Sequence, residues 1–301
     1  MPLTLSDEVR RAVDAGRPVV ALESTMIAHG LPRPRNREVA GQLAARLTDA
    51  GVVPALIAVV DGVPKVGVDE ATLDRLVEDI EVVKLSIRDL PMAMASRRTG
   101  ATTVAATAHL AHRAGIRVFA TGGLGGVHRD VADSFDESAD LTALSRTPIA
   151  VVASGVKSIL HVAATLERLE TLGISVLGYR TDWFPGFYLR DSGYPVDWRV
   201  ESADEVAQVL HRSEELGLSG ATIVANPIPA GDQLDPALHE RALAGGLAAA
   251  QVAGIQGKAL TPFLLAHMHR ATEGASLEAN IALALDNVRV AAEIAMCWSA
   301  R

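Results

Sequence analysis

Cysteine and aromatic residues are scarce in this sequence. Its 301 residues include one cysteine, Cys297, and aromatic residues make up 4% of the chain. A single thiol excludes an intramolecular disulfide and any cysteine-based zinc site. The remaining composition, 49% hydrophobic and 21% charged, is typical of a folded protein rich in alanine and valine. A chain of this length can bury a large core.

Positive charge and long apolar runs are lacking as well. Lysine and arginine number 28 against 36 acidic residues, which gives a formal net charge of −8. This balance argues against a nucleic-acid groove but leaves room for a local phosphate site. No apolar run approaches the roughly 20 residues of a membrane span. The stretch from Met1 to Glu8 carries acids where a signal peptide needs a basic start. We therefore expect a cytoplasmic enzyme that binds neither nucleic acid nor membrane.

Short β-rich runs alternate with helical patterns along the chain. Strands are predicted at residues 18–22, 55–60, 82–84, 117–121, 149–153, 175–179 and 221–225. Helices are predicted at residues 6–15, 35–50, 103–114, 158–172, 203–215, 236–249, 262–270 and 276–298. This alternation predicts a three-layer α/β/α fold with a largely parallel mixed sheet, in a single domain over residues 1–301. Ligands of such sheets bind outside the carboxyl ends of the strands. Residues 182–200 are interpreted as an excursion from this domain.

Lys157 stands where a predicted strand meets a predicted helix. The apolar run at 149–153 is followed by Gly155 and then by the helical pattern at 158–172. The positive end of a helix disfavours a protonated amine, and partial burial does so further. A free amine beside a sugar or carbonyl forms a Schiff base. The alternative is a lysine that only extends its ammonium group to solvent at a helix start.

Glu23 ends the first predicted strand and should stand at the ligand-facing edge of the sheet. A carboxyl group in an apolar setting has a raised pKa and can serve as a general acid. The alternative is a glutamate that caps a helix or pairs with a lysine. The residues alone do not decide between these two interpretations.

A glycine-rich run, TGGLGGVHR, occupies residues 121–129 directly after a predicted strand. Glycines let a backbone approach an anion closely, so a phosphate or sugar loop is one interpretation. A tight structural turn is the other. The spacing does not match a dinucleotide-binding fingerprint. His128, which closes the run, is a candidate ligand-binding residue.

Three acids lie close together at residues 136–140. Oxygen ligands at this density suit a hard divalent cation such as Mg²⁺ or Mn²⁺ bound mainly through water, with Asp136 as the candidate ligand. Alternatively, Ser138 or Asp140 caps a helix that starts near Leu141. Both interpretations can hold if different residues serve each.

Two further polar residues stand at positions that suit a binding site. Lys84 ends a predicted strand and, with the threonines at 102–103, could bind a phosphate, although a solvated lysine is the usual alternative. Asn280 lies about one turn into the last predicted helix, where its amide faces either a cleft or solvent.

Several motifs together resemble the pseudouridine-5′-phosphate glycosidase family. The match runs from ALEST at residues 21–25 to NIAL at residues 280–283 and so covers nearly the whole chain. Its most specific motifs are TGGLGGVHR (121–129), SADL (138–141), GVKSIL (155–160), NPIP (226–229) and TPFLL (261–265). The sequence departs from the family pattern at Glu137, Ser154, residues 161–164 and Asp286, none of which is a proposed catalytic position.

The resemblance implies reversible cleavage of the C–C bond that joins uracil to ribose 5-phosphate in pseudouridine 5′-phosphate. Lys157 would attack C1′ and form an imine with the opened sugar, and Glu23 would protonate the departing uracil carbon. Asp136 would hold a divalent metal, typically Mn²⁺, largely through waters. The resemblance also implies a homotrimer with an α/β/α fold.

Other residues would contact the substrate. The resemblance implies this role for Lys84, the backbone around Val104, and the run Ser138, Ala139 and Asp140. We add His128 and Asn280 as candidate base or sugar contacts.

Two other functions compete with this interpretation. A C-glycosidase or C-glycosyl synthase that joins ribose 5-phosphate to another acceptor in secondary metabolism would carry the same motifs for the sugar. A non-catalytic nucleotide-binding protein would bind ligand without turnover, which the joint presence of Glu23, Lys157 and Asp136 disfavours.

Overall fold

One mixed sheet organises the protein. The computed structural model describes residues 3–255, 257 and 260–300. The described strands form an eleven-stranded sheet whose main order is β1 (Thr4–Leu5), β4 (Val63–Val66), β3 (Val53–Val60), β2 (Val19–Glu23), β7 (Val118–Ala120), β8 (Ala150–Ala153), β11 (Thr222–Ala225), β9 (Ser175–Tyr179) and β10 (Trp198–Val200). Two further strands, β6 (Gly100–Thr102) and β5 (Val83–Leu85), pair with each other, and β6 also pairs with β3. The β3–β4 and β3–β6 pairs are antiparallel and the others are parallel.

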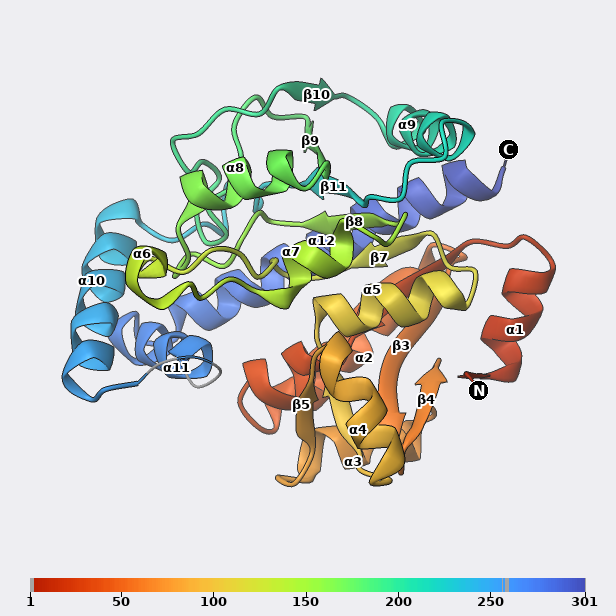
Figure 1. Ribbon diagram of the computed structural model, residues 1–301, viewed down its shortest axis with the longest axis horizontal. Helices are drawn as coiled ribbons and strands as arrows, with labels where there is room; N and C mark the ends of the chain where they lie inside the picture. Colours follow the sequence, from red (N-terminus) through yellow and green to blue (C-terminus); the bar gives the residue numbers. More distant parts are fainter. Residues whose placement is uncertain (1–2, 256, 258–259, 301) are drawn as a thin grey trace.

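Helices cover both faces of this sheet, which confirms the predicted three-layer fold (Figure 1). On one face α12 (Ala275–Ser299) contacts β2, β7 and β8, and α2 (Arg35–Asp49) and α9 (Ala203–Glu215) pack against it. On the other face α5 (Val104–Arg113) contacts β2 and β3, with α7 (Ala139–Leu144) beside it. In addition, α8 (Val162–Thr171) contacts β9, and α1 (Asp7–Asp14) contacts β2 and β3.

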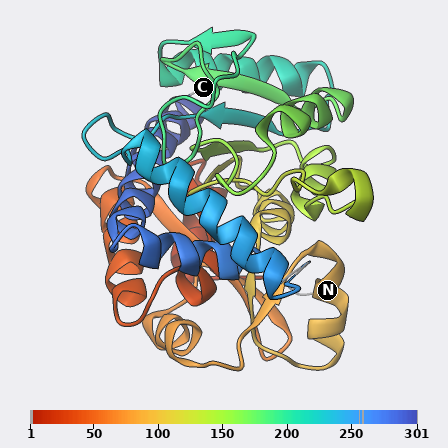
Figure 2. The same ribbon diagram turned by 90° about the vertical axis from the view of Figure 1, so that its left-hand side faces the viewer.

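The remaining helices surround the carboxyl ends of the strands or lie at the edge of the sheet. They are α3 (Glu70–Glu78), α4 (Leu90–Ala95), α6 (Val131–Ser134), α10 (Pro236–Val252), α11 (Leu260–Ala271) and the short turns η1 (Met26–Gly30) and η2 (Ile87–Asp89). The helices α10 and α11 pack together beyond one end of the sheet, and α11 also contacts α12 and η1 (Figure 2). No helix among the described residues is long and apolar enough to cross a membrane.

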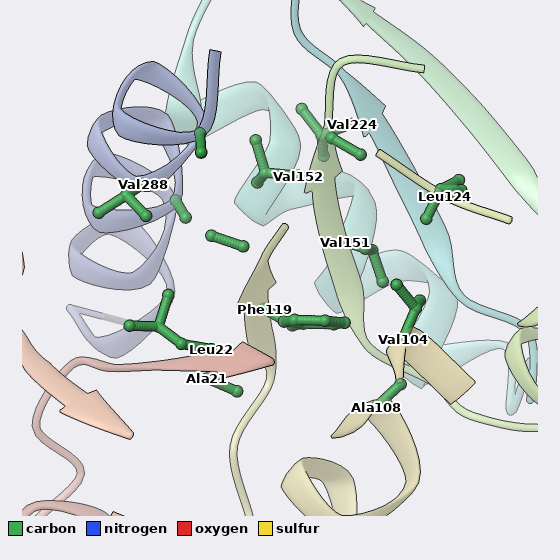
Figure 3. Packing of buried hydrophobic residues seen from close by; sticks show 14 of the residues in the cluster. Ala21, Leu22, Val104, Ala108, Phe119, Leu124, Val151, Val152, Val224 and Val288 are labelled. Atoms are coloured by element: carbon green, nitrogen blue, oxygen red, sulfur yellow. The ribbon is translucent and has the colours of Figure 1, made fainter. Parts of the chain in front are cut away.

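The core lies on both sides of the central strands. Figure 3 shows the ring of Phe119 on the side of the sheet that α5 covers, near Val104 and Ala108, and Val288 of α12 on the other side, near Leu22. A strand that is buried on both faces needs apolar side chains at every position. This is why the central strands read as continuous apolar runs and were predictable from the sequence.

All seven predicted strands are present, each within two residues of its predicted bounds. The strand at Ser175–Tyr179 and the helix at Ala203–Glu215 have the predicted bounds at both ends. The sequence analysis missed β1, β4, β6 and β10, and also α3 and α4. These strands are two to four residues long, and β4 contains Pro64, so none presents an apolar run.

The helix predicted at residues 158–172 starts later than expected. It begins at Val162, with His161 as the N-cap, whose ring accepts a hydrogen bond from the Ala164 N–H at 3.3 Å. The preceding residues form a turn in which the N–H of Leu160 donates to the carbonyl of Lys157 at 2.9 Å. Lys157 therefore does not lie at a helix start, and the prediction that a helix end acts on its amine was wrong.

Candidate active site

A cavity of about 360 Å³ opens at the carboxyl ends of β2, β5 and β8, beside the loop that follows β7. Every residue predicted for the site lines this one cavity. These residues are Glu23, Lys84, Val104, His128, Asp136, Ser138, Ala139, Asp140, Lys157 and Asn280. They come from segments up to 257 positions apart in the chain, and the parallel sheet brings them together because its strands end at the same edge.

Glu23 is the last residue of β2 and is 8% exposed. The hydroxyl of Thr121, at the end of β7, donates a hydrogen bond to its carboxyl group. Burial raises the pKa of the Glu23 carboxyl above its usual range, and the nearby Lys157 and the Thr121 hydroxyl offset only part of this rise. Glu23 is therefore buried among polar and charged groups, and its carboxyl group retains its proton to higher pH than an exposed glutamate does.

Lys157 is held by the glycine-rich run. Its ammonium group donates to the carbonyl of Gly123 at 2.9 Å, and its backbone N–H donates to the carbonyl of Leu124 at 3.1 Å. The turn before it requires Gly155, whose φ is +75° and where a side chain would collide with the carbonyl of Pro185. Tertiary pairing with the glycine-rich run therefore fixes the backbone that carries Lys157.

The glycine-rich run supports the walls of the cavity through its own N–H groups. The N–H of Gly125 donates to Asp140 at 2.9 Å, and that of Val127 donates to the hydroxyl of Thr165 at 3.0 Å. The N–H groups of Leu124 and His128 donate to backbone carbonyls. Because these four N–H groups already have protein partners, they are not available to an anion.

Asp140 joins this run to α5. Its carboxylate is buried and accepts one hydrogen bond from the N–H of Gly125 and one from the N–H of Ala105, both at 2.9 Å. The same carboxylate adds to the raised pKa of Glu23. Asp140 thus fixes the distance between the glycine-rich run and the start of α5.

The start of α5 faces the cavity, and Asp140, rather than the N-cap residue of the helix, accepts a hydrogen bond from its first turn. Its N-cap is Thr103, which makes no capping hydrogen bond and whose buried hydroxyl has no partner among the described residues. Val104 opens the helix, and Lys84 on β5 lines the same wall. A helix N-terminus beside a lysine suits a phosphate group.

The residues of the acidic segment at 136–140 have different roles. Ser138 caps α7 by accepting a hydrogen bond from the Asp140 N–H at 3.2 Å, so the capping interpretation is confirmed for Ser138. Glu137 forms an ion pair with Arg168 at 2.9 Å. Asp136 lines the cavity, and its Oδ2 lies 3.9 Å from Nε2 of His128. Across residues 3–255, 257 and 260–300, no group of three His, Cys, Asp or Glu side chains could hold a metal by itself.

Asn280 reaches the cavity from α12. It is 7% exposed, and its side-chain amide makes no hydrogen bond to another residue that the structure describes. Because Asn280 lines the cavity, its amide can form hydrogen bonds with a ligand bound there.

The chain resembles known proteins over its whole length. The family model described as "Indigoidine synthase A like protein" matches residues 8–297. A pseudouridine-5′-phosphate glycosidase of Frankia alni is 60% identical over 99% of this chain and 83% of its own length. Another, of Salinispora tropica, is 60% identical over 98% of this chain and 91% of its own length.

The chain belongs to the pseudouridine-5′-phosphate glycosidase family of enzymes. The resemblance inferred from the five motifs is thereby confirmed. Among solved structures, the prealnumycin C-glycosynthase AlnA in complex with ribulose 5-phosphate matches with a TM-score of 0.91 and 38% identity, over 98% of this chain and 96% of that one.

Several residues of the candidate site were missed by the sequence analysis. His29 of η1 lines the cavity, and burial, together with the charge of Lys84, lowers its pKa. Thr121 holds Glu23, and Asn287 of α12 holds the loop that contains Thr121. No clear signal for Asn287 was visible in the sequence, because it stands between Asp286 and Arg289 in a segment that looks polar.

Proposed function

We propose that this enzyme cleaves the C–C glycosidic bond of pseudouridine 5′-phosphate reversibly, giving uracil and ribose 5-phosphate. The observation that supports this most is the joint placement of a buried carboxyl group, Glu23, and an amine, Lys157, on one cavity. A carbon leaving group needs a proton donor, and the carbon that it leaves needs an electron-pair donor. A carboxyl group that retains its proton and an imine-forming lysine supply these two functions.

The phosphate of the substrate is assigned to the start of α5. Lys84, the Thr103 hydroxyl and the N–H of Val104 surround this end of the cavity. They provide a positive charge, a hydroxyl donor and the positive end of a helix, which together bind a phosphate. This assignment leaves the sugar between α5 and Lys157, and the nucleobase beside Glu23 and Asn280.

Cleavage would begin with attack of the uncharged Lys157 amine on C1′. A C–N bond forms, the bond between C1′ and the ring oxygen breaks, and that oxygen takes the proton that the amine loses. The lone pair of the nitrogen then forms the imine as the bond from C1′ to uracil C5 breaks. The electron pair goes to C5, which takes the proton of Glu23. Water then hydrolyses the imine, with the Glu23 carboxylate accepting a proton, and ribose 5-phosphate leaves.

A relative provides support for the open-chain sugar. The prealnumycin C-glycosynthase AlnA was solved with ribulose 5-phosphate, a sugar phosphate that cannot close a furanose ring because its 5-hydroxyl is esterified. A cavity of the same fold at 38% identity therefore accepts an open five-carbon chain with a terminal phosphate. The imine that we propose on Lys157 has the same open-chain form.

The residues around Asp136 fit a divalent cation that retains most of its water. Asp136 is one of several acidic residues that line the cavity, and no three His, Cys, Asp or Glu side chains among the described residues are grouped closely enough for a closed site. Mg²⁺ and Mn²⁺ commonly bind to one or two carboxylates together with water and a substrate phosphate. Such an ion would neutralise the phosphate charge next to α5, and Asp136 would hold it.

Asp136→Asn is expected to weaken Mn²⁺ binding about 10- to 100-fold, since the variant loses the charged ligand. Titration of the protein with Mn²⁺, followed by electron paramagnetic resonance of the free ion, measures this directly. Glu137→Gln is the matched control, because that carboxylate is paired with Arg168. Equal Mn²⁺ affinity in the wild type and in both variants would contradict the metal assignment.

The function itself is tested by product analysis. Purified enzyme with pseudouridine 5′-phosphate is expected to release uracil and ribose 5-phosphate, and the two products together are expected to regenerate the substrate. Pseudouridine without the phosphate should be cleaved far more slowly, because it lacks the group assigned to α5. Absence of turnover in both directions would refute the proposal.

The synthase alternative differs only in the acceptor. It gains support from the match to a C-glycosynthase, although the identity to that protein is 38% against 60% for the glycosidases. Incubation of ribose 5-phosphate with uracil or with polycyclic aromatic acceptors separates the two functions. The homotrimer and the cytoplasmic location that we expected from the sequence stay predictions for this chain.

A further inference from the structure

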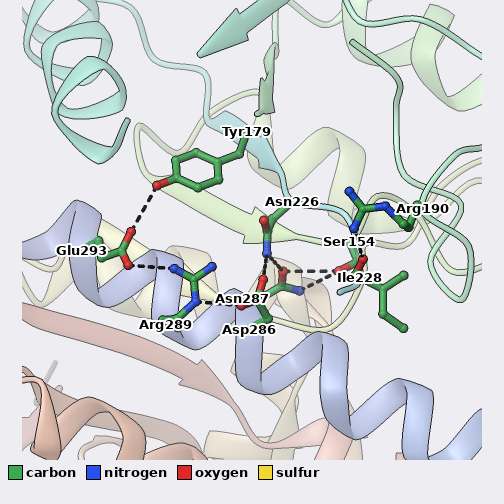
Figure 4. A network of polar contacts seen from close by, with 9 residues as sticks. All are labelled: Ser154, Tyr179, Arg190, Asn226, Ile228, Asp286, Asn287, Arg289 and Glu293. Carbon is green, nitrogen blue, oxygen red and sulfur yellow. Dashed lines mark hydrogen bonds and ion pairs between the residues drawn. The ribbon is translucent and has the colours of Figure 1, made fainter. Parts of the chain in front are cut away.

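A buried amide on α12 connects three loops at the carboxyl edge of the sheet. Asn287 is 0% exposed. Its Nδ2 donates to the carbonyls of Thr121 at 2.8 Å and Gly122 at 3.3 Å, and lies 3.1 Å from the Ser154 hydroxyl. Its Oδ1 accepts from Nδ2 of Asn226 at 2.9 Å (Figure 4). One side chain therefore links the ends of β7, β8 and β11.

A chain of hydrogen bonds that starts at Arg289 near the surface decides where the oxygen and the NH₂ group of the Asn287 amide point. Arg289 is always protonated, and it donates to Asp286 at 2.7 Å. The other oxygen of Asp286 must then accept, and it accepts from Nδ2 of Asn226 at 2.8 Å. Since the NH₂ group of Asn226 also faces Asn287, the amide oxygen of Asn287 faces Asn226 and its NH₂ group faces the loop carbonyls. Asn226 of the NPIP motif and Asp286 therefore orient the Asn287 amide. Asp286 is one of the residues that depart from the family pattern.

The segment that Asn287 holds contains the partners of both proposed catalytic groups. Thr121 donates its hydroxyl to Glu23. Gly123, two residues later, accepts the hydrogen bond from the Lys157 ammonium at 2.9 Å. A shift of this segment would therefore move the proton donor and the amine relative to each other.

We propose that Asn287 is a positioning residue that holds Glu23 and Lys157 at their working separation through residues 121–123. The inference rests on the proposed function, because it concerns the geometry of that reaction. It goes beyond a structural role, since a buried amide that only stabilised the fold would change stability without changing turnover in the folded enzyme. A displacement of about 1 Å at a reacting centre lowers the rate by about 100-fold.

The test is Asn287→Asp, which keeps the size of the side chain but replaces the NH₂ donor by an oxygen that cannot donate to two carbonyls when ionised. We expect kcat for cleavage to fall about 10- to 100-fold. The dissociation constant for inorganic phosphate is expected to stay within about twofold, because the groups assigned to the phosphate, Lys84 and the start of α5, lie outside residues 121–123. Asn226→Ala, which removes the group that orients Asn287, is expected to lower kcat in the same way but less.

Tyr179→Phe is the matched control. It removes the hydrogen bond of the Tyr179 hydroxyl to Glu293, at the far end of the same polar network, and leaves Asn287 in place. Its kcat should equal that of the wild type even where its melting temperature falls. If Asn287→Asp does not fold, Asn226→Ala decides the question.

The outcomes separate this inference from the proposed function. Folded variants with wild-type kcat, in an enzyme that cleaves pseudouridine 5′-phosphate, would overturn the positioning role alone. A wild-type enzyme that does not cleave would overturn the proposed function, and the positioning role with it. A loss of kcat at constant affinity for inorganic phosphate in both variants supports the inference.

Discussion

Replacing Lys157 by alanine is expected to lower kcat/KM for pseudouridine 5′-phosphate on the order of 10⁴-fold or more, because the variant loses the nucleophile that divides the reaction into steps. The fold should persist. The backbone at this position is held by hydrogen bonds to the glycine-rich run, and these do not involve the side chain. Steady-state uracil release measures the loss, and thermal unfolding checks the fold.

The same variant gives a direct view of the imine. Wild-type enzyme treated with ribose 5-phosphate and borohydride is expected to gain one covalent sugar phosphate on Lys157, which peptide mass spectrometry locates. Lys157→Ala should gain none at this position. Lys65→Ala is the matched control, because Lys65 lies on β4 and does not line the cavity. An adduct-free wild type, together with full activity in Lys157→Ala, would refute covalent catalysis.

The Glu23→Gln variant should separate the two halves of the reaction. Without a proton donor the uracil carbanion cannot leave, so cleavage is expected to slow by about 10²- to 10⁴-fold. Imine formation between Lys157 and free ribose 5-phosphate involves no protonation of a nucleobase carbon. The borohydride adduct should therefore still form in this variant.

A substitution at the surface, Glu38→Gln, is the control for Glu23→Gln. Glu38→Gln changes an exposed glutamate on α2 that pairs with Arg35, so both turnover and adduct formation should equal those of the wild type. If Glu23→Gln cleaves the substrate at the wild-type rate, Glu23 is not the proton donor.

The pH dependence follows from the same carboxyl group. Burial raises the pKa of Glu23, whereas Lys157, the Thr121 hydroxyl and Lys84 lower it and Asp140 raises it. Because the protonated form is the active acid, cleavage is expected to decline only as the pH rises through this raised pKa, above the range of an ordinary glutamate. Thr121→Val removes a donor that stabilises the carboxylate, so the decline should move to still higher pH. A profile of kcat/KM against pH measures both effects.

The sequence determined the layered fold and the pair of residues that we place at its centre. Strands buried on both faces must be apolar throughout, so the central runs and the polar residues that end them, Glu23 among them, were visible before the structure. Lys157 was found from its place between a buried strand and a helical pattern. The glycine-rich run was also visible, but its role was not, because its hydrogen-bond partners lie elsewhere in the chain.

Only the tertiary structure decided how these groups are held. Thr121 and Glu23 are 98 positions apart, and Asn287 and Thr121 are 166 apart, so no local pattern connects them. The order of strands in the sheet makes them neighbours. The same pairing turned the residues after Lys157 away from the helix that their periodicity predicted, because backbone hydrogen bonds to the glycine-rich run replaced the first helical turn. Local propensity gives the elements and the residues at their ends, whereas the contacts between elements decide which of those residues can act together.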